Sequence, residues 1–568
     1  MGALVPATLK EFDYGAVELT GGPLKAQYDI IRASYLALDN DRLLKVYRQG
    51  AGLPAPGADM GGWYDRDGFV PGHSLGQYIS GLARLGRTSG DQACTNKVHE
   101  LVEGFGATLG RNNRIYPGPN AQNVWPCYIL DKHMAGLVDA YTLSGAEQAR
   151  DLIARVYQGA LPYIPERGRD RIGKKDPPYD ETYVLPETLF TASALINERA
   201  LYDRAVAYLL DEDFFDPLAR GQDVLPGRHA YSHAIALSSA GKAHLVLGDA
   251  RYLRAMANAH DLLVATQQYA SGGWGPNETF IEPHKGRLYE SLQTTEDHFE
   301  TPCGTYAAIK LARYLLCATG DAQYGDGLER VVYNCLLGAK MPDSNGDYFY
   351  YSTYSARARK VFYQKKWPCC SGTLVQGVAD FVKNIYFHQD DVLAVNLFTP
   401  SRVRWRQGKQ TITLSQETEY PLRQTVSLYV KCDDPTSFTL CLRIPSWVEG
   451  SCSFEVNGKP KHIETEKGFA VIRKQWKTGD HLKFEIPCEF RRESIDDLHK
   501  DTVAMMRGPL LYVERNSNGG ATLPSLDNLR EVDGLTGVQR LAAGVTSRDF
   551  VPFYFIHDES YTTYFEMA

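Results

Sequence analysis

Two adjacent cysteines, Cys369 and Cys370, are the residues of this chain whose type and spacing point most directly to chemistry. They lie in the segment WPCCSGT at positions 367–373. Neighbouring residues rarely reach disulfide geometry without strain, so such a pair is suited to presenting two thiolates to one metal ion or one reaction centre. Free cysteines also serve as small buried apolar residues, and core packing is the alternative interpretation.

A third cysteine and a carboxylate extend this set. Cys303 ends the segment Glu300-Thr301-Pro302-Cys303, so three sulfurs and one carboxylate are available. Zinc binds thiolates and carboxylates in tetrahedral sites, and these four groups therefore predict a zinc (Zn2+) site. Metal coordination lowers the pKa of a thiol, so one cysteine of the set could remain a thiolate and act as a nucleophile.

Glu278 is a second carboxylate with a potential chemical use, because it follows the glycine-rich segment SGGWGP at positions 271–276. Such a loop can bring its acid close to a bound substrate, although a glutamate in a loop is solvated by default. A nucleophile facing a general acid/base is the arrangement of retaining glycoside hydrolysis, here with sulfur in place of one carboxylate.

Length and composition restrict the class of protein. The 568 residues are too many for one ordinary core and predict two or three domains. A net charge of −7 without long Lys/Arg runs argues against nucleic-acid binding, and no stretch of 18 apolar residues predicts a membrane span. Eleven cysteines without a regular spacing, and a start without signal-peptide features, favour a cytoplasmic location. Secretion or a periplasmic location stays open if a leader has been removed.

Residues 26–388 have the pattern of stacked helical hairpins. Short Gly-Asp or Ser-Gly turns at positions 88–91, 143–146, 247–250 and 319–322 each follow an apolar-periodic segment. In such turns glycine suits the left-handed cap, and aspartate can cap the next helix. Six helices are predicted, at about 74–87, 128–143, 187–203, 232–247, 303–319 and 371–385, and together they predict an (α/α)6 barrel.

The starts of the inner helices of such a barrel converge at one mouth, where ligands bind in concave polar sites. Each predicted start carries a chemically capable group. These are His73; Asp131 with Lys132 and His133; Glu187; His229 with His233; Glu300 with Cys303; and Cys369 with Cys370. A single histidine in such a set is more often structural than a ligand, but the recurrence at six starts favours one shared site.

The rest of the chain is predicted to be β-structure. Residues 389–568 contain short alternating apolar runs and turn signals, which predict one or two antiparallel β-sandwiches. The segment at about 515–545 is rich in Gly, Ser and Asn and predicts an exposed loop before a final strand at 551–568. Residues 1–25 are expected to pack on this β region.

Several segments together resemble a known family, glycoside hydrolase family 127 and its relatives, the β-L-arabinofuranosidases. The segments are GHSLGQYIS at 72–80, MAGLVDAY at 134–141, LPGRHA at 225–230, GGWG at 272–275 leading to Glu278, CGTY at 303–306, CCSGT at 369–373 and LAVNLF at 393–398. The resemblance covers most of the chain and rests on the order and spacing of these segments.

The resemblance implies a multidomain α plus β protein, an (α/α)6 catalytic barrel followed by antiparallel β-sandwich domains. It implies a zinc ion held by Glu300, Cys303, Cys369 and Cys370, with Cys369 as nucleophile and Glu278 as acid/base. It places His229, His73 and Glu187 in the sugar pocket, where we also expect Asp131, His133 and His233. The implied reaction is release of a terminal furanose, most simply β-L-arabinofuranose, from a small carbohydrate substrate. The oligomeric state stays open and includes a homodimer.

This chain departs from the family pattern at one metal ligand. The family commonly has a single residue between glutamate and cysteine, whereas Pro302 makes the spacing here Glu300-x-x-Cys303. The shift could move Glu300 off the metal, with Glu296, Asp297 or His298 compensating. Asp131 and Pro186 also replace a histidine and an asparagine that many relatives carry.

Two alternative functions use the same predicted barrel. One is a lyase or unsaturated-uronide hydrolase that uses Asp131, His229 and Glu187, and its activity would not depend on Cys369. The other is a non-catalytic sugar-binding protein whose zinc is structural. Ligand binding by such a protein would survive the loss of both Cys369 and Glu278, and no turnover would be seen.

Overall fold

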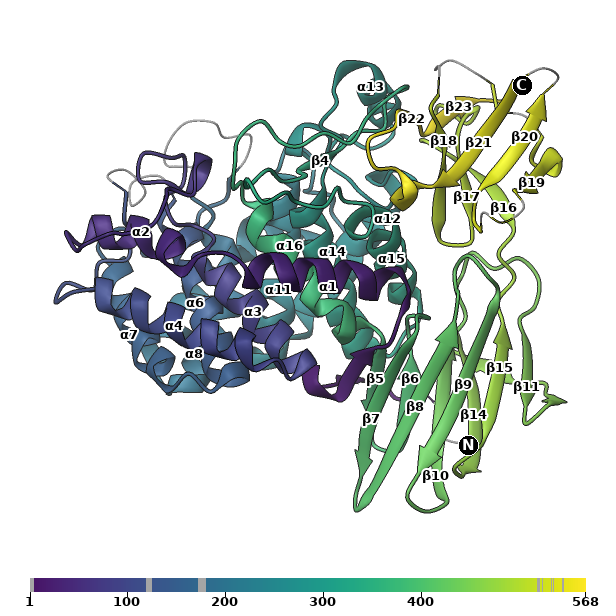
Figure 1. Cartoon of the computed structure of the whole chain (residues 1–568), viewed down its shortest axis with the longest axis horizontal. Coiled ribbons are helices and arrows are strands. Elements are labelled where there is room, and N and C mark those ends of the chain that lie inside the picture. The colour runs from purple at the N-terminus through teal and green to yellow at the C-terminus, as the bar shows by residue number, and fades with distance from the viewer. Residues whose placement is uncertain are drawn as a thin grey trace.

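The computed structural model describes residues 5–118, 125–171, 180–517 and, with short gaps, 522–567. Figure 1 shows a helical body on one side and strand-rich parts stacked along the other. The α-helices lie between Gly22 and Ala379, and the long strands begin at Tyr386. Among the described helices, none combines the length and apolar character needed to cross a membrane.

Six helices in the described part of the chain form the inner ring of a barrel. Each contacts the next, and the last closes on the first. They are α3 (Leu75–Ser89), α6 (Pro126–Ser144), α8 (Pro186–Ile196), α11 (Ala230–Leu247), α14 (Thr301–Thr319) and α16 (Cys370–Ala379). The helical part is therefore the predicted (α/α)6 barrel.

The outer ring mostly follows the chain. After the first five inner helices come α4 (Gln92–Thr108), α7 (Glu147–Ala160), α9 (Arg199–Ala207), α12 (Ala250–Thr266) and α15 (Gln323–Val331). The sixth outer position is taken by α1 (Gly22–Leu36), which packs on α16. Figure 1 shows α1 lying across the front of α16 and α14. The start of the helical region thus completes the ring that its end leaves open.

Glycine caps end four of the inner helices where the sequence predicted turns. Gly90, Gly145, Gly248 and Gly320 have φ of 69°, 67°, 72° and 62°, a region that side chains with a Cβ rarely adopt. The next helix is capped by aspartate in two of these turns, where Asp91 accepts from Ala93 N and Asp249 from Arg251 N.

Two predicted helix boundaries were wrong. The segment at 187–203 is two helices, because Asn197 adopts a left-handed conformation (φ 56°) that ends α8, and α9 starts at Arg199. Asparagine tolerates this conformation better than other side chains with a Cβ. The segment at 371–385 is α-helical only to Ala379 and continues as a 3-10 turn over Asp380–Asn384.

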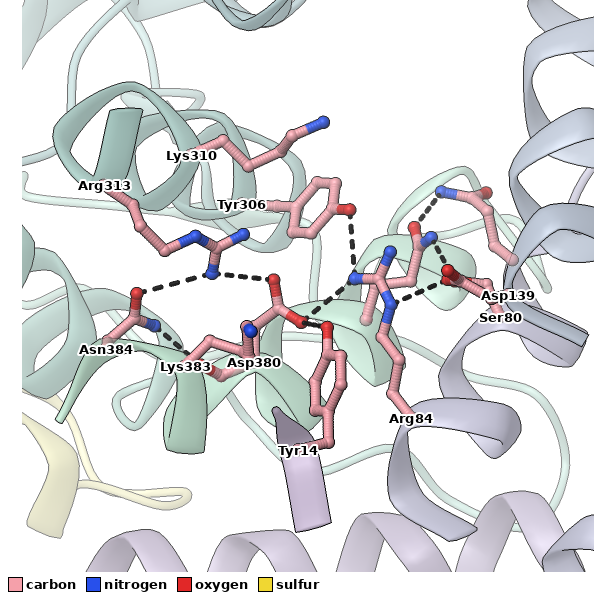
Figure 2. Close-up of polar contacts among 12 residues, drawn as sticks. Tyr14, Ser80, Arg84, Asp139, Tyr306, Lys310, Arg313, Asp380, Lys383 and Asn384 are labelled. Carbon is pink, nitrogen blue, oxygen red and sulfur yellow. Dashed lines mark hydrogen bonds and ion pairs between the residues drawn. The ribbon is translucent and has the colours of Figure 1, made fainter. Parts of the chain in front are cut away.

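A buried charge network lies at the end of α16 remote from Cys370 (Figure 2). The carboxylate of Asp380 accepts from Arg84 of α3 and Arg313 of α14, each at 3.0 Å, and from the hydroxyl of Tyr14 at 2.6 Å. Arg84 also donates to Asp139 of α6 at 2.9 Å. The network thus joins three inner helices and the N-terminal segment to the end of α16.

Two sheets follow the barrel, and their strands pair antiparallel except for β6 and β10 of the first sheet, which are parallel. The first has strand order β1-β5-β6-β10-β14-β13, and the second has β12-β11-β15-β9-β8-β7-β2. Their facing sides pack through aromatic contacts such as Trp405 with Phe438, with ring centroids 5.6 Å apart. The N-terminal strands β1 (Lys10–Glu11) and β2 (Val17–Leu19) pair with β5 (Tyr386–Gln389) and β7 (Ser401–Gln407), one in each sheet. Remaining strands are β6 (Val392–Val395), β8 (Gln410–Thr418), β9 (Thr425–Cys432), β10 (Thr436–Arg443), β11 (Ser453–Val456), β12 (Lys459–Pro460), β13 (Glu464–Glu466), β14 (Phe469–Trp476) and β15 (His481–Glu485).

The end of the described chain forms one eight-stranded sheet rather than a single final strand. Its strands are β16 (Phe490–Ser494), β17 (Thr502–Arg507), β18 (Leu510–Arg515), β19 (Leu529–Glu531), β20 (Gln539–Ala543), β21 (Thr546–Pro552), β22 (Tyr561–Thr562) and β23 (Tyr564–Glu566). The prediction of a loop over 515–545 was wrong for β19 and β20, because paired backbone outweighs the weak strand propensity of Gly and Asn. Part of that segment lies outside the described residues.

Candidate active site

The two adjacent cysteines lie at the start of α16 and face Cys303 of α14. The sulfur of Cys303 is 3.5 Å from each of the sulfurs of Cys369 and Cys370 and 3.0 Å from the hydroxyl of Thr373. Cys303 and Cys370 are fully buried, and Cys369 is 7% exposed. Two helix starts that are far apart in sequence thus bring the three thiols together at the mouth of the barrel.

Glu300 joins this cluster although Pro302 changes its spacing from Cys303. Its Oε1 is 3.2 Å from the sulfur of Cys369 and 4.0 Å from that of Cys370. Glu300 ends the short strand β3 (Phe299–Glu300), which pairs with β4 (Tyr351–Ser352), and Pro302 occupies the first turn of α14. Proline fits there because the first helical N–H groups have no partner within the helix. The additional residue is therefore accommodated between β3 and α14, and Glu300 still reaches the cysteine cluster.

The four groups fit a metal ion. Their potential ligand atoms all lie within 4.8 Å of one another, and all four residues are buried. Oε2 of Glu300 is buried without a hydrogen-bond partner, which is costly for a carboxylate unless a cation or another donor is present. Three sulfurs and one carboxylate oxygen are a donor set that suits zinc.

The three thiols of the cluster are electrostatically unequal. Burial opposes ionisation of Cys369, but its hydrogen-bonding contacts with Cys303, Cys370 and Tyr350 hold its pKa well below the ordinary value. Burial and the hydrogen bonds to its two neighbours raise the pKa of Cys303, and burial with the Cys369 charge raises that of Cys370. Protein groups alone thus favour the thiolate at Cys369.

The predicted acid/base Glu278 lies on a strained loop beside this cluster. Gly275, Asn277 and Glu278 all have positive φ, at 83°, 53° and 58°. A left-handed glutamate costs conformational energy, so the surrounding structure must hold this loop in place. Main-chain bonds from Asn277 N to Asp297 O and from Phe280 N to Arg228 O do so on either side of Glu278.

Three donors surround the carboxylate of Glu278. Oε1 accepts from the hydroxyls of Tyr350 at 2.9 Å and Tyr351 at 2.6 Å, and Oε2 lies 3.5 Å from Nε2 of His229. Burial would raise the pKa of Glu278, but His229 and the two tyrosines lower it to about 2. The Tyr350 hydroxyl also lies 3.4 Å from the sulfur of Cys369. One phenol therefore contacts both candidate catalytic groups.

A cavity of about 140 Å³ opens between Glu278 and Cys369. Most of its walls are residues that the sequence did not single out. The lining comprises Trp63, Phe69, Val70, Trp125, Tyr128, Arg171, Glu181, His229, Tyr231, Glu278, Glu300, Tyr350 and Cys369. Aromatic rings of this kind provide faces for the apolar side of a sugar ring. The sequence does not indicate which of its 35 tyrosines form this cleft.

Two of the predicted substrate-binding histidines lie at the site. His229 lines the cavity, and its Nδ1 accepts from Ser232 N, which caps α11. His73 is fully buried just behind the wall, with its ring 6.3 Å from that of Tyr128. Its Nδ1 bonds to Val70 O at 2.8 Å, and its Nε2 has no protein partner.

Asp131 and Glu187 lie inside the barrel and do not line the cavity. Asp131 pairs with Lys132 at 2.9 Å and accepts from Thr188 at 2.7 Å. Glu187 pairs with Lys310 and accepts from Tyr314. Their carboxylates are thus engaged in contacts between inner helices.

His133 and His233 also lie away from the cavity. His133 packs against Phe105 of α4 and contacts the hydroxyl of Tyr47 at 3.0 Å; burial and the charge of His73 lower its pKa to about 3. His233 is fully buried, with Nε2 2.8 Å from Asp170. Both occupy packing positions on helices whose first residues reach the mouth.

Comparison with known proteins gives consistent matches. The model of the GH127 beta-L-arabinofuranosidase catalytic domain matches residues 16–383, and the model of the GH127 middle domain matches residues 392–488. A curated non-reducing end beta-L-arabinofuranosidase of Bifidobacterium longum subsp. longum is 25% identical over 365 residues, which are 59% of this chain and 53% of that protein. The chain thus spans about half the length of this curated relative.

Two solved structures share the fold along nearly the whole chain. A GH127 beta-arabinofuranosidase superposes with a TM-score of 0.79 at 18% identity, covering 99% of this chain and 98% of that one. A GH127 beta-L-arabinofuranosidase from Geobacillus stearothermophilus T6 gives a TM-score of 0.74 at 19% identity, with coverage of 97% and 100%.

Proposed function

The chain belongs to glycoside hydrolase family 127, and on that premise we propose that it is a retaining exo-glycoside hydrolase that releases a terminal furanose. The curated relative makes β-L-arabinofuranose the first sugar to test. One observation carries the proposal: Cys369, in a cluster suited to a metal, and Glu278 both contact Tyr350 in the same cavity.

Glu300, Cys303, Cys369 and Cys370 would hold a zinc ion. When bound, zinc keeps coordinating thiols deprotonated and offsets their negative charge. Cys369 is the member of the set that lines the cavity, whereas Cys303 and Cys370 are fully buried. Cys369 is accordingly the cysteine that can reach a substrate carbon.

In the first step the sulfur of Cys369 attacks the anomeric carbon. The carbon–oxygen bond to the leaving group breaks with its electron pair on oxygen, which takes a proton from the Glu278 carboxyl. In the second step Glu278 removes a proton from water, and the water oxygen attacks the same carbon. The sulfur–carbon bond then breaks with its electron pair on sulfur. Two displacements at one carbon give net retention.

Glu278 must gain a proton before the first step, although its pKa in the protein is about 2. That low value depends on donation from His229, Tyr351 and Tyr350. A substrate whose oxygens accept hydrogen bonds from these donors would release the carboxylate and raise its pKa. Substrate binding thus allows Glu278 to be protonated near neutral pH, as general acid catalysis requires.

The test is replacement of each catalytic candidate by a similar side chain. We expect Cys369→Ser and Glu278→Gln each to lower turnover of a nitrophenyl β-L-arabinofuranoside by about a thousandfold or more, because each removes a reacting group. Cys317→Ser is the matched control, since Cys317 lies at the far end of α14. Near-normal turnover in either variant would remove that residue from the mechanism.

Two further measurements separate the proposal from its alternatives. Proton NMR of the first-formed sugar should show the same anomer as the substrate, and an inverted product would exclude the double displacement. Metal analysis of native protein should find one zinc per chain, lost in Cys303→Ser. Native protein without zinc, or full activity after chelation, would contradict the metal-linked nucleophile.

A further inference from the structure

An arginine–glutamate pair lies in the cavity wall, and the proposed mechanism does not use it. Nη1 of Arg171 donates to Oε1 of Glu181 at 2.6 Å, and both residues line the cavity. The guanidinium carbon of Arg171 lies 5.5 Å from the ring centroid of Trp125, another wall residue. Glu181 Oε1 is also 3.8 Å from Nδ1 of His229. The pair thus lies beside the aromatic ring of Trp125 and next to His229, which in turn contacts Glu278.

Several contacts fix the position of this pair. Asp170, beside Arg171, accepts from Arg228 at 2.7 Å and pairs with His233 at 2.8 Å. Thr182, beside Glu181, accepts from Arg169 N at 2.8 Å through its hydroxyl. A donor and an acceptor held in this way lose little conformational entropy when a ligand binds.

Asp180, also beside Glu181, is the third anchor. Its carboxylate accepts from the backbone N–H groups of Cys127 and Tyr128 at the start of α6. It also accepts from Glu181 N at 3.0 Å. Glu181 is therefore tied to the same helix start that contributes Tyr128 to the cavity wall.

The charges around the cavity decide which ligand suits the pair. Glu181, Glu278, Glu300 and Cys369 all line it, and Arg171 is the one lysine or arginine among its described lining residues. Arg171 is already paired with Glu181 at 2.6 Å, so an anionic sugar would find no unpaired lysine or arginine among these residues and would face the Glu278 carboxylate, which repels it. A neutral sugar is therefore favoured over a uronate.

We propose that Arg171 and Glu181 together bind two neighbouring hydroxyls of a neutral sugar and so set the specificity of the cavity. A carboxylate accepts a hydrogen bond from one hydroxyl, while an unused N–H of the adjacent guanidinium donates to the next. A buried polar pair of this kind penalises a sugar that lacks either hydroxyl, because its groups would lose a partner. The inference rests on the proposed glycosidase function and names its substrate class, neutral sugars with a vicinal diol.

The experiment is a cycle that combines protein and substrate changes. Wild type, Glu181→Gln and Arg171→Lys are each assayed on a nitrophenyl furanoside and on its 2-deoxy and 3-deoxy analogues. We expect each variant to lower kcat/KM on the parent about 10- to 100-fold, but only about 2-fold on the analogue that lacks the partner hydroxyl. Arg171→Lys keeps the charge and loses the planar fork of donors, so it reports geometry rather than charge.

Glu290→Gln is the matched control, because it breaks an exposed arginine–glutamate pair on α13 (Arg287–Thr294) without touching the cavity. It should act like wild type on all three substrates. Equal losses on parent and deoxy substrates in both cavity variants would overturn the inference and leave the pair a purely structural role. Thermal unfolding of each variant shows whether a uniform loss reflects misfolding.

Calorimetric binding of unactivated methyl furanosides makes the inference independent of turnover. The methyl pentofuranoside should bind wild type at least about 10-fold more tightly than its deoxy analogues and the corresponding furanuronate. Equal or tighter binding of the furanuronate would overturn the inference. Absence of hydrolysis together with diol-dependent binding would refute the proposed function while upholding this inference.

Discussion

At the scale of single residues, the Tyr350 hydroxyl has the most consequential position, because it contacts both candidate catalytic groups. We expect Tyr350→Phe to lower kcat by about 10- to 100-fold, since a hydrogen bond to a charged group contributes about 1.5–3 kcal/mol. Tyr351→Phe removes a contact to Glu278 alone and should cost less. Steady-state kinetics of both variants checks the order, and a larger loss in Tyr351→Phe would contradict the bridging role.

Some residues of the candidate site could be identified from the sequence, and others could not. Cys369, Cys370, Cys303 and Glu278 were identifiable because rare residue types stood beside glycine or each other. The structure brings the three cysteines into one cluster, and Cys369 and Glu278 line the same cavity. Tyr350, Arg171 and Glu181 carried no such signal, since tyrosine, arginine and glutamate are common and their convergence depends on loops.

The two histidines that lie elsewhere have a geometric explanation. His133 is five residues after Tyr128, which lines the cavity, and at 3.6 residues per turn their side chains point about 140° apart on α6. His233 is four residues after His229, but His229 is the cap that precedes α11 and has extended backbone. Sequence spacing alone therefore does not place their side chains on one face.

At the scale of elements, α16 carries two candidate ligands at its start and is fixed at its other end by Asp380 (Figure 2). Asp380 is fully buried between Arg84 and Arg313, which, against the effect of burial, keep its pKa well below the usual range. We expect Asp380→Asn to lower the free energy of unfolding by about 3–5 kcal/mol, because it removes the buried negative charge that Arg84 and Arg313 share. A large fall in the thermal midpoint is the measurement.

The difference in stability between wild type and Asp380→Asn should become smaller as the pH falls. Because the folded pKa of Asp380 is depressed, its stabilisation is present above the ordinary aspartate pKa of about 3.9 and is lost as pH falls below it. The midpoint difference between wild type and Asp380→Asn should therefore shrink on acidification. Asp558→Asn, which removes an exposed partner of Lys340, should leave the thermal midpoint close to that of wild type. A constant difference across acidic pH would contradict the assignment.

Much of the barrel was predictable from local signals, because glycine and aspartate at the turns specify helix ends without reference to tertiary structure. The exception at Asn197 shows the limit, since asparagine ends helices less often than glycine and is therefore a weaker signal in the sequence. The closure of the ring by α1 was not predictable from these signals. It depends on contacts between segments more than 300 residues apart, such as the hydroxyl of Tyr35 in α1 with the carbonyl of Ser371 in α16.

At the scale of the whole molecule, a buried lysine is one of the residues that join the barrel loops to the C-terminal part of the chain. Lys360 lies in the segment that leads to the two cysteines, and its ammonium donates to the carbonyls of Phe553 and Ile556 at 2.8 and 2.9 Å. It also lies 4.1 Å from the centroid of the Phe553 ring. Burial lowers the pKa of Lys360 to about 7, despite the opposing charge of Glu559.

This lowered pKa predicts how the folding stability contributed by Lys360 changes with pH. Between about pH 7 and pH 10 the unfolded chain holds the proton and the folded chain does not, so folding stability contributed by Lys360 rises with pH. Relative to Lys360→Met, wild type should gain roughly 1.4 kcal/mol per pH unit across this range and nothing below it. Thermal midpoints of both proteins from pH 6 to 10 measure the gain, with Lys340→Met as a control at a partly exposed lysine nearby. If the wild type and Lys360→Met midpoints instead keep a constant separation, Lys360 remains charged in the folded protein and its burial does not control this junction.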